Sequence, residues 1–306
     1  MSVVLIEGFD HISWPSVKNW LHTFTALGTD QAGLAGGRLG GYSWSMEATS
    51  GCILGACYVR SDFLKMLSAT TTQAIIGIAV YKKPISDGGF IHTGTRSDVQ
   101  LFRFVDDGGS PIAGFWFDSL SRPVCSGVGT ADFTHQDNSW NYYEYRVKIN
   151  GSNGEAELRI NGSSTPALSG TGINNGTNPI GGIGLHNEVG DQGSSGWRAD
   201  DIYMVDCTTG GSPANTFLGD CRVETILPIG VGSNTAWTPN GGANWDRVDD
   251  AVPGADDDAT TVSTTTVGAV DTYDTADVSV GSGQVYAVQT NLYAKKLDAG
   301  SKEFAA

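Results

Sequence analysis

The stretch "WNYYEYRVKINGSNGEAELRINGSS", residues 140–164, decides the fold of this chain. Alternate residues are apolar over 143–149 and again over 156–160. A period of two is typical of strands that bury one face against a core. The Asn, Gly and Ser residues between the two runs mark a tight turn. The stretch therefore predicts an antiparallel β-hairpin.

Charged residues occupy the other face of both strands and predict the register. Directly opposed unlike charges stabilise an antiparallel pair by up to roughly 1 kcal/mol, and like charges destabilise it. A type II′ turn at Gly151-Ser152 opposes unlike charges at three positions, whereas a tip at Asn150-Gly151 or a four-residue loop opposes like charges. The predicted pairs are Lys148 with Glu155, Arg146 with Glu157, and Glu144 with Arg159.

The hairpin also raises the question of catalysis, because Glu155 and Glu157 share one strand face. A retaining glycosidase needs two carboxyls roughly 5 Å apart, one of them with a raised pKa. The basic residues predicted opposite lower a carboxylate pKa and favour a solvated salt-bridge ladder instead. His135, Asp137 and Ser139 spell three letters of a triad, but closeness in sequence is not triad geometry. We expect no catalytic residues and a non-enzymatic protein.

Strand-like runs separated by Gly, Asp, Ser and Pro turns continue along the chain of 306 residues, which contains 42 Gly. This pattern predicts an all-β sandwich without crossover helices. We expect a jelly-roll sandwich over 1–208, an extended arm or linker with one strand over 209–275, and an incomplete terminal β-element over 276–306. The strand predicted at "QVYAVQTNLYAKKLDAG" needs a partner from this chain or another.

The charge balance excludes two classes of partner. Lys and Arg number 18 against 33 Asp and Glu, a formal charge of -15. Such a field repels nucleic acids and anionic membrane surfaces. No run of about 18 apolar residues occurs, so membrane insertion is not expected. The first residues also lack the pattern of a cleaved secretion signal.

The five cysteines argue against a zinc site and a full disulfide framework, because their number is odd and no CxxC spacing occurs. Free, mostly buried thiols made in a reducing cytoplasm are the simplest interpretation. Bridges between Cys52 and Cys57, or between Cys207 and Cys221, remain open alternatives.

Two kinds of ligand site have candidate residues. Asp256 and Asp258 offer hard oxygen ligands for calcium, the one cofactor we consider, although a solvated acidic loop is the simpler interpretation. Asp200 and Asp201 are adjacent, so they point to opposite faces of a strand and cannot both bind one calcium ion from there. Glycan stacking is the second kind, with ordinary packing of tryptophan as its alternative. Its candidates are Trp197, Trp237 and Trp245.

Four landmarks, taken together, suggest a family. They are "VVLIEGFDH", the hairpin, "WRADDIYMVD" and "NTFLGDCRVETILPIGVGSNTAWTPNGGANWDRVDD", within residues 1 to 250. In these the sequence resembles virion structural proteins of tailed bacteriophages that carry a concanavalin A-like, laminin-G-like jelly-roll domain.

The resemblance implies a virion location after synthesis in the bacterial host cytoplasm. It implies a structural component, as a tail fibre, tail-tip or capsid-surface protein, whose partners are other virion proteins and copies of itself. A glycan-binding adhesin that recognises the host surface is the alternative, and a polysaccharide depolymerase is a third.

Overall fold

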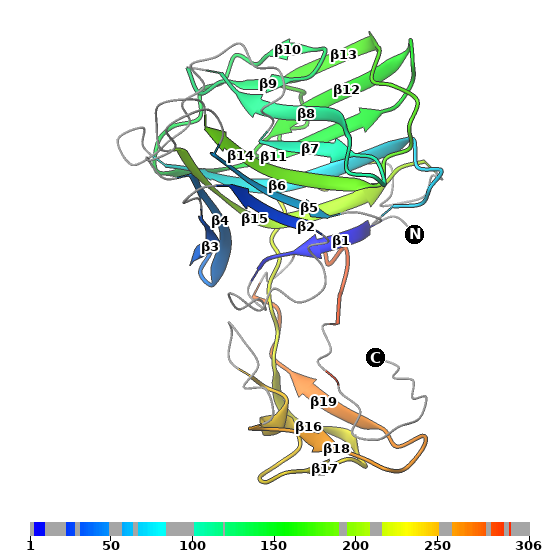
Figure 1. Ribbon diagram of the computed structural model, residues 1–306. Coiled ribbons are helices and arrows are strands. Elements are labelled where there is room, and N and C mark those ends of the chain that lie inside the picture. The colour runs from blue at the N-terminus through cyan, green and yellow to red at the C-terminus, as the bar shows by residue number, and fades with distance from the viewer. Residues whose placement is uncertain are drawn as a thin grey trace. The chain divides into compact units, whose positions relative to one another are not determined.

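The computed structural model divides the chain into two units, which are described separately (Figure 1). Unit 1 comprises Met1–Phe9 and Trp14–Val223, and unit 2 comprises Asp10–Ser13 and Glu224–Ala306. The structure describes residues 3–9, 23–27, 31–48, 57–63, 67–83, 101–118, 120–189, 195–208, 216–250, 259–279, 283–290 and 294.

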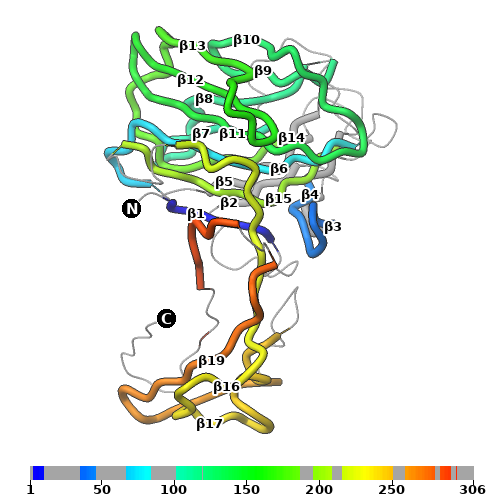
Figure 2. Tube along the Cα trace, turned by 180° about the vertical axis from the view of Figure 1, so that it is seen from behind, coloured from blue at the N-terminus to red at the C-terminus, as the bar shows by residue number. Residues whose placement is uncertain are grey.

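Unit 1 is a sandwich of two sheets whose described pairings are antiparallel, and Figures 1 and 2 show the sheets as two layers. Sheet A has the order β13-β12-β11-β6-β15-β4-β3, with β1 beside β15. Its strands are β1 (Val3–Glu7), β3 (Gln31–Gly36), β4 (Tyr42–Ala48), β6 (Gln73–Lys82), β11 (Ser139–Lys148), β12 (Gly154–Ile160), β13 (Leu168–Ile173) and β15 (Ser195–Asp206).

Sheet B has the order β10-β9-β8-β7-β14-β5-β2. Its strands are β2 (Thr23–Leu27), β5 (Cys57–Phe63), β7 (Phe102–Val105), β8 (Pro111–Phe117), β9 (Pro123–Cys125), β10 (Gly129–Thr130) and β14 (Gly182–Val189). The predicted fold class, an all-β sandwich, is confirmed by these two antiparallel sheets. Among the described residues, no helix is long and apolar enough to cross a membrane.

Aromatic side chains fill the space between the sheets. Tyr143 and Tyr145, on the inward face of β11, are fully buried. The Tyr143 ring lies 5.0 Å from Phe115 and the Tyr145 ring 5.9 Å from Phe104, measured between centroids. Burial of each such ring stabilises the fold by roughly 1.5–3 kcal/mol. The apolar alternation of the hairpin is therefore the pattern that builds the core.

The hairpin register is confirmed, but its turn differs from the predicted type. The observed pairs are Lys148 with Glu155, Arg146 with Glu157, and Glu144 with Arg159. Gly151 does not have the positive φ that a type II′ turn requires at this position. Instead, Asn150 Oδ1 accepts the N–H groups of Ser152 and Asn153, both at 3.0 Å. The side chain of Asn150 therefore closes the tip as an Asx turn.

A second hydrophobic cluster lies on the outer face of sheet A. Its buried members are Ile75, Ala79, Tyr142, Tyr203, Val205 and Cys207. Phe217, Leu218 and Cys221 pack against it from residues 217–223, here called the strap. Unit 1 extends to Val223, so the sandwich includes a segment that sequence alone assigns to the arm.

Unit 2 contains two small two-stranded sheets and one 3-10 turn. β16 (Pro228–Thr235) pairs with β19 (Asp271–Thr275), and β17 (Thr238–Pro239) pairs with β18 (Val262–Ser263). The turn is η2 (Trp245–Arg247). The predicted arm over 209–275 thus holds more strands than the one expected.

The predicted strand that begins at residue 284 is not formed in the described residues 283–290. Val285, Tyr286 and Val288 are exposed by 55%, 38% and 84%. An apolar alternation builds a strand only when a neighbouring strand accepts its hydrogen bonds. The described part of this chain supplies no such neighbour.

No residue of unit 2 is buried among its described positions, 224–250, 259–279, 283–290 and 294. The buried apolar side chains of the described chain all belong to unit 1, from Leu5 to Cys207. Unit 2 therefore has no hydrophobic core in its described part.

Candidate functional site

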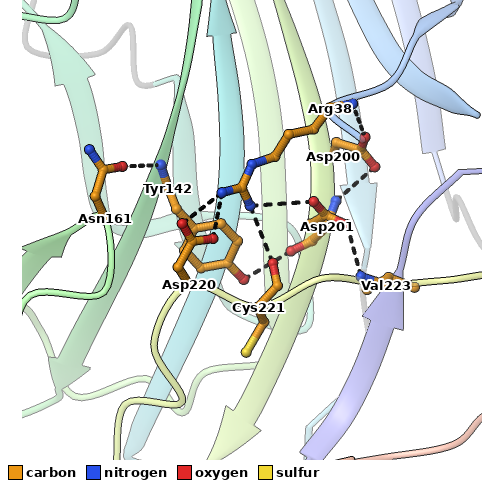
Figure 3. A network of polar contacts seen from close by, with 8 residues as sticks. All are labelled: Arg38, Tyr142, Asn161, Asp200, Asp201, Asp220, Cys221 and Val223. Atoms are coloured by element: carbon orange, nitrogen blue, oxygen red, sulfur yellow. Dashed lines mark hydrogen bonds and ion pairs between the residues drawn. The ribbon is translucent and has the colours of Figure 1, made fainter. Parts of the chain in front are cut away.

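A bulge in β15 brings two adjacent carboxylates to one arginine (Figure 3). The pairing of β15 with β6 shifts between Asp200 and Tyr203, and Asp201 has a φ of 50°. Asp tolerates this left-handed region better than most residues. Asp200 accepts the backbone N–H of Arg38 at 2.8 Å, and Asp201 Oδ2 lies 3.4 Å from Arg38 Nη1. The expectation that the two carboxylates point apart is wrong, because it holds only for a regular strand.

Arg38 connects sheet A to the strap. Its Nη2 lies 2.6 Å from Asp220 Oδ1, and its Nη1 donates to the Cys221 carbonyl at 3.3 Å. The guanidinium also lies 5.3 Å from the centroid of the Tyr142 ring, within cation–π range. Figure 3 shows Arg38 reaching between Asp201 on β15 and the strap. One side chain thus contacts β11, β15 and the strap.

Asp201 receives the end of the strap. Its carboxyl is almost fully buried, and Oδ1 accepts the Val223 N–H at 2.8 Å. Burial raises the pKa of Asp201 to about 6, although the Val223 hydrogen bond and the Arg38 charge act in the opposite direction. The Tyr142 hydroxyl donates to the Asp201 backbone carbonyl at 2.9 Å, which fixes the bulge from β11.

Glu144 receives the start of the strap. Its Oε1 accepts the Gly219 N–H at 2.8 Å and the hydroxyl proton of Tyr203. The Leu218 N–H donates to the Tyr203 hydroxyl oxygen at 3.2 Å. Burial raises the pKa of Glu144, and these hydrogen bonds partly offset that rise. Two buried carboxylates, one on β11 and one on β15, therefore accept strap N–H groups.

The salt-bridge ladder of the hairpin is formed but only partly solvated. Arg146 and Lys148 bind their opposite glutamates at 2.7 and 2.8 Å. The hydrogen bond from Lys148 lowers the pKa of Glu155, which disfavours an acid role. The Arg159 guanidinium lies 4.0 Å from the ring centroid of Phe217, so the strap covers the middle of the ladder.

His135, Asp137 and Ser139 do not form a triad, because His135 binds the backbone carbonyl of Ser139 and the Ser139 hydroxyl donates to the Gln136 carbonyl. His135 is fully buried, its Nε2 donates to the Ser139 carbonyl at 3.0 Å, and its Nδ1 accepts the Tyr143 hydroxyl at 2.8 Å. Burial lowers the pKa of His135 to about 4, so the ring is neutral at pH 7. Asp137 pairs instead with Lys82 at 2.5 Å. His135 is therefore a hydrogen-bonded core residue.

The structure separates the three candidate glycan-binding tryptophans. Trp197 is fully buried and donates its Nε1–H to the His186 carbonyl at 3.0 Å, so its assignment to an exposed stacking site is wrong. The alternation of β15 turns this ring into the sandwich. Trp237 and Trp245 are half-buried in unit 2.

A single carboxylate organises the surroundings of Trp237. Asp271 Oδ1 accepts the Trp237 N–H at 2.7 Å, and Oδ2 accepts the Asn244 amide at 2.5 Å and the Tyr273 hydroxyl at 3.1 Å. The Trp237 Nε1–H donates to the Ala269 carbonyl at 3.0 Å. Hydrogen bonds around Asp271 thus hold this part of unit 2 together.

The candidate calcium ligands Asp256 and Asp258 lie outside the described residues. Within the described ranges, no three His, Cys, Asp or Glu side chains form a group that could hold a metal ion. Cys125, Cys207 and Cys221 are free thiols in the structure.

Sequence reasoning missed three residues: Arg38, Asp271, and Glu144 in its role as an acceptor of a strap N–H group. Arg38 stands in a glycine-rich turn, and its ionic partners are 163 and 182 residues away in sequence. The one local signal for Glu144 is its apparent pairing with Arg159, which points to the ladder and not to the strap.

Comparison with known proteins gives weak structural similarities. Neither a family model nor a curated protein matches the chain. A Trypanosoma rangeli sialidase matches at 9% identity and a TM-score of 0.34, over 66% of this chain and 34% of the sialidase, so the match spans about a third of that protein.

The catalytic domain of a glycoside hydrolase family 131 protein from Coprinopsis cinerea matches at 9% identity and a TM-score of 0.37, over 58% of this chain and 74% of that domain. The exoplasmic/lumenal domain of VIP36 matches at 8% identity and a TM-score of 0.38, over 70% of this chain and 93% of that domain. The fold is therefore assigned from the two sheets themselves.

Proposed function

We propose that this protein is a non-enzymatic structural component of a tailed-bacteriophage particle, assembled in several copies through unit 2. The main observation that supports assembly through unit 2 is that no residue in its described part is buried. The four sequence landmarks support a virion protein as the class, in a tail fibre, a tail tip or the capsid surface.

A unit whose described part has no buried core needs a partner to remain folded. Burial of apolar surface is the main offset to the conformational entropy lost on folding. Described residues of unit 2 instead expose large apolar side chains by 38% to 93%. They are Ile229, Val231, Val267, Val270, Val278, Val285, Tyr286 and Val288. Their exposed area is on the order of the ~800 Å² per partner that a standard interface buries.

The partner that best fits the strands of unit 2 is another copy of this chain. Val231 lies opposite Tyr273 in the β16–β19 pair and is half-exposed, as is Ile229 on the same strand. A two-stranded sheet is marginal alone and leaves edges that accept another strand. A partner that is present whenever the chain folds is another copy of it, and homo-oligomers are the commonest soluble assemblies.

The mass of the full chain in solution tests the assembly. We expect an oligomer by sedimentation velocity, and we expect Val231→Asp to shift it toward the monomer. The matched control is Leu120→Asp, because Leu120 is also exposed (61%) but belongs to unit 1. A monomeric wild-type chain whose unit 2 amides resist hydrogen exchange would refute the assembly. Antibody labelling of intact phage particles tests the virion location separately.

A glycan-binding adhesin is the second candidate, and Trp237 and Trp245 are the observation that favours it. Both rings are half-buried, and Trp237 is fixed through its Nε1–H. A fixed, partly exposed indole can stack on a pyranose ring. A glycan array with and without calcium tests this function. Binding that Trp237→Ala abolishes without changing the oligomer would favour the adhesin, and release of reducing ends from a bacterial polysaccharide would indicate a depolymerase.

A further inference from the structure

The strap covers groups that are more deeply buried than the strap itself. Each of its seven residues keeps at least partial exposure. Beneath it, Tyr142, Glu144, Asp201 and Tyr203 are exposed by 3% or less. Phe217, Leu218 and Cys221 pack against the cluster beneath, but no strap residue is itself buried. The strap can therefore open locally at lower free energy than the sheet that it covers.

We propose that the strap is a releasable latch, which docks on the outer face of sheet A as one piece and lengthens the connection to unit 2 when it undocks. This inference stands apart from the proposed function, because every contact that carries it lies within unit 1.

Beside these apolar contacts, polar anchors are distributed along the length of the strap. Leu218 and Gly219 donate their N–H groups to Tyr203 and Glu144, as described above. Asp220 binds Arg38, and Val223 donates its N–H to Asp201. Because Arg38 contacts the strap and Asp201 at once, loss of Arg38 weakens the middle and the end of the strap together.

Protons are coupled to docking through the two buried carboxyls. Charged or titratable groups around Asp201 come from the turn before β4, from β11, from β15 and from the strap; they are Arg38, Tyr142, Asp200, Asp220, Cys221 and Arg222. Those around Glu144 are Arg159, Tyr203, Tyr142 and Cys221. Burial raises the pKa of Cys221 to about 12 and also raises that of both tyrosines, so these groups stay neutral between pH 4 and 8.

The sign of the coupling follows from the direction of the shifts. The docked strap covers Asp201 and Glu144, and burial raises their pKa values by more than the strap N–H groups lower them, so we infer that the docked form binds protons more tightly. Acid therefore favours docking, and the latch is weakest above pH 6. The full shift of the Asp201 pKa, from 3.8 to about 6, sets an upper bound of roughly 100-fold on this coupling, which is reached only below about pH 4.

Release changes the reach of unit 2. Seven extended residues span at most about 25 Å. An undocked strap is therefore a tether of at most that length, whereas a docked strap has its path fixed on sheet A.

Amide hydrogen exchange on the full chain tests the latch. We expect Arg38→Gln to accelerate exchange at Leu218, Gly219 and Val223 together by at least tenfold, while amides of β6 are unchanged. Arg122→Gln is the matched control, because Arg122 forms a comparable ion pair with Asp118 at 2.7 Å that does not involve the strap. If Arg38→Gln does not fold, Asp220→Asn tests the same ion pair from an exposed residue.

The proton coupling is tested in the same experiment. After correction for intrinsic exchange rates, we expect up to roughly tenfold greater protection of the strap amides at pH 5 than at pH 8 from the Asp201 shift. Asp201→Asn should give strong protection at both pH values, since the amide oxygen still accepts the Val223 N–H. Strap amides that exchange only together with those of β6 would overturn the latch, and equal protection at both pH values would overturn its coupling to protons.

Discussion

The backbone φ of Asp201 determines the direction in which its carboxylate points. At a φ of 50° the residue interrupts the alternation of β15, and its carboxylate turns toward Arg38. Glycine would adopt this angle with less strain but would supply no acceptor for the Val223 N–H. Asp combines tolerance of the left-handed region with a carboxylate, so the position serves both the bulge and the strap.

His135 should make the stability of unit 1 depend on acid. Its folded pKa is about 4 against 6.5 when unfolded, so its contribution is fully present above pH 6.5 and is lost as the pH falls toward 4. The loss is on the order of 3 kcal/mol at pH 4. Urea denaturation of the full chain between pH 4 and 8, monitored by tryptophan fluorescence, measures it.

A variant separates this contribution from the other titrating groups. His135→Gln cannot take up the proton, so its stability should be lower at pH 7 but nearly flat between pH 6.5 and 4 apart from the opposite slope of Asp201. Asp201 gains stability over the same range, because its pKa is raised on folding. A His135→Gln variant with the slope of the wild type would contradict the assignment.

At the level of elements, two glycines next to the hairpin strands should respond differently to a methyl group. Gly151 lacks a positive φ, and a Cβ there would lie 3.4 Å from Thr177 Cγ2. Gly162 has a φ of 69°, and its Cβ would lie 3.2 Å from the backbone nitrogen of Asp220 in the strap. We expect Gly151→Ala to change the free energy of unfolding by less than about 0.5 kcal/mol and Gly162→Ala to lower it by about 1–2 kcal/mol.

Urea denaturation at pH 7 checks both glycine variants. A large decrease in the free energy of unfolding for Gly151→Ala would indicate that Gly151 has a positive φ, as in the type II′ turn that the sequence predicts. Equal, small effects would show that the strap yields at Gly162 without strain.

The hairpin and the strap also show what a sequence reveals about such a fold. The pairing of Arg146 with Glu157 could be predicted because both residues lie on one hairpin, and their charges discriminate between neighbouring registers. The pairing of Arg38 with Asp220 could not, because no local pattern connects residues so far apart. The burial of Trp197 could not be predicted either, because the glycine-rich sequence before it is typical of an exposed loop.

At the scale of the whole molecule, the two units gain their stability in different ways. Unit 1 buries aromatic rings between two sheets, whereas the described part of unit 2 relies on hydrogen bonds around Asp271. A net hydrogen bond contributes only about 1 kcal/mol, so such a network cannot replace a core. Unit 2 should therefore depend on association, and unit 1 should not.

Calorimetry at several protein concentrations distinguishes the two cases. We expect one unfolding transition from unit 1 whose Tm is independent of concentration. A second transition from unit 2 should rise in Tm as the chain becomes more concentrated, because association stabilises the bound form by mass action. Val231→Asp should lower the second transition alone, since Val231 is half-exposed on β16 of unit 2. If the Tm of neither transition depends on protein concentration, the described apolar surface of unit 2 is not an interface between copies. Unit 2 must then be stabilised within a single chain.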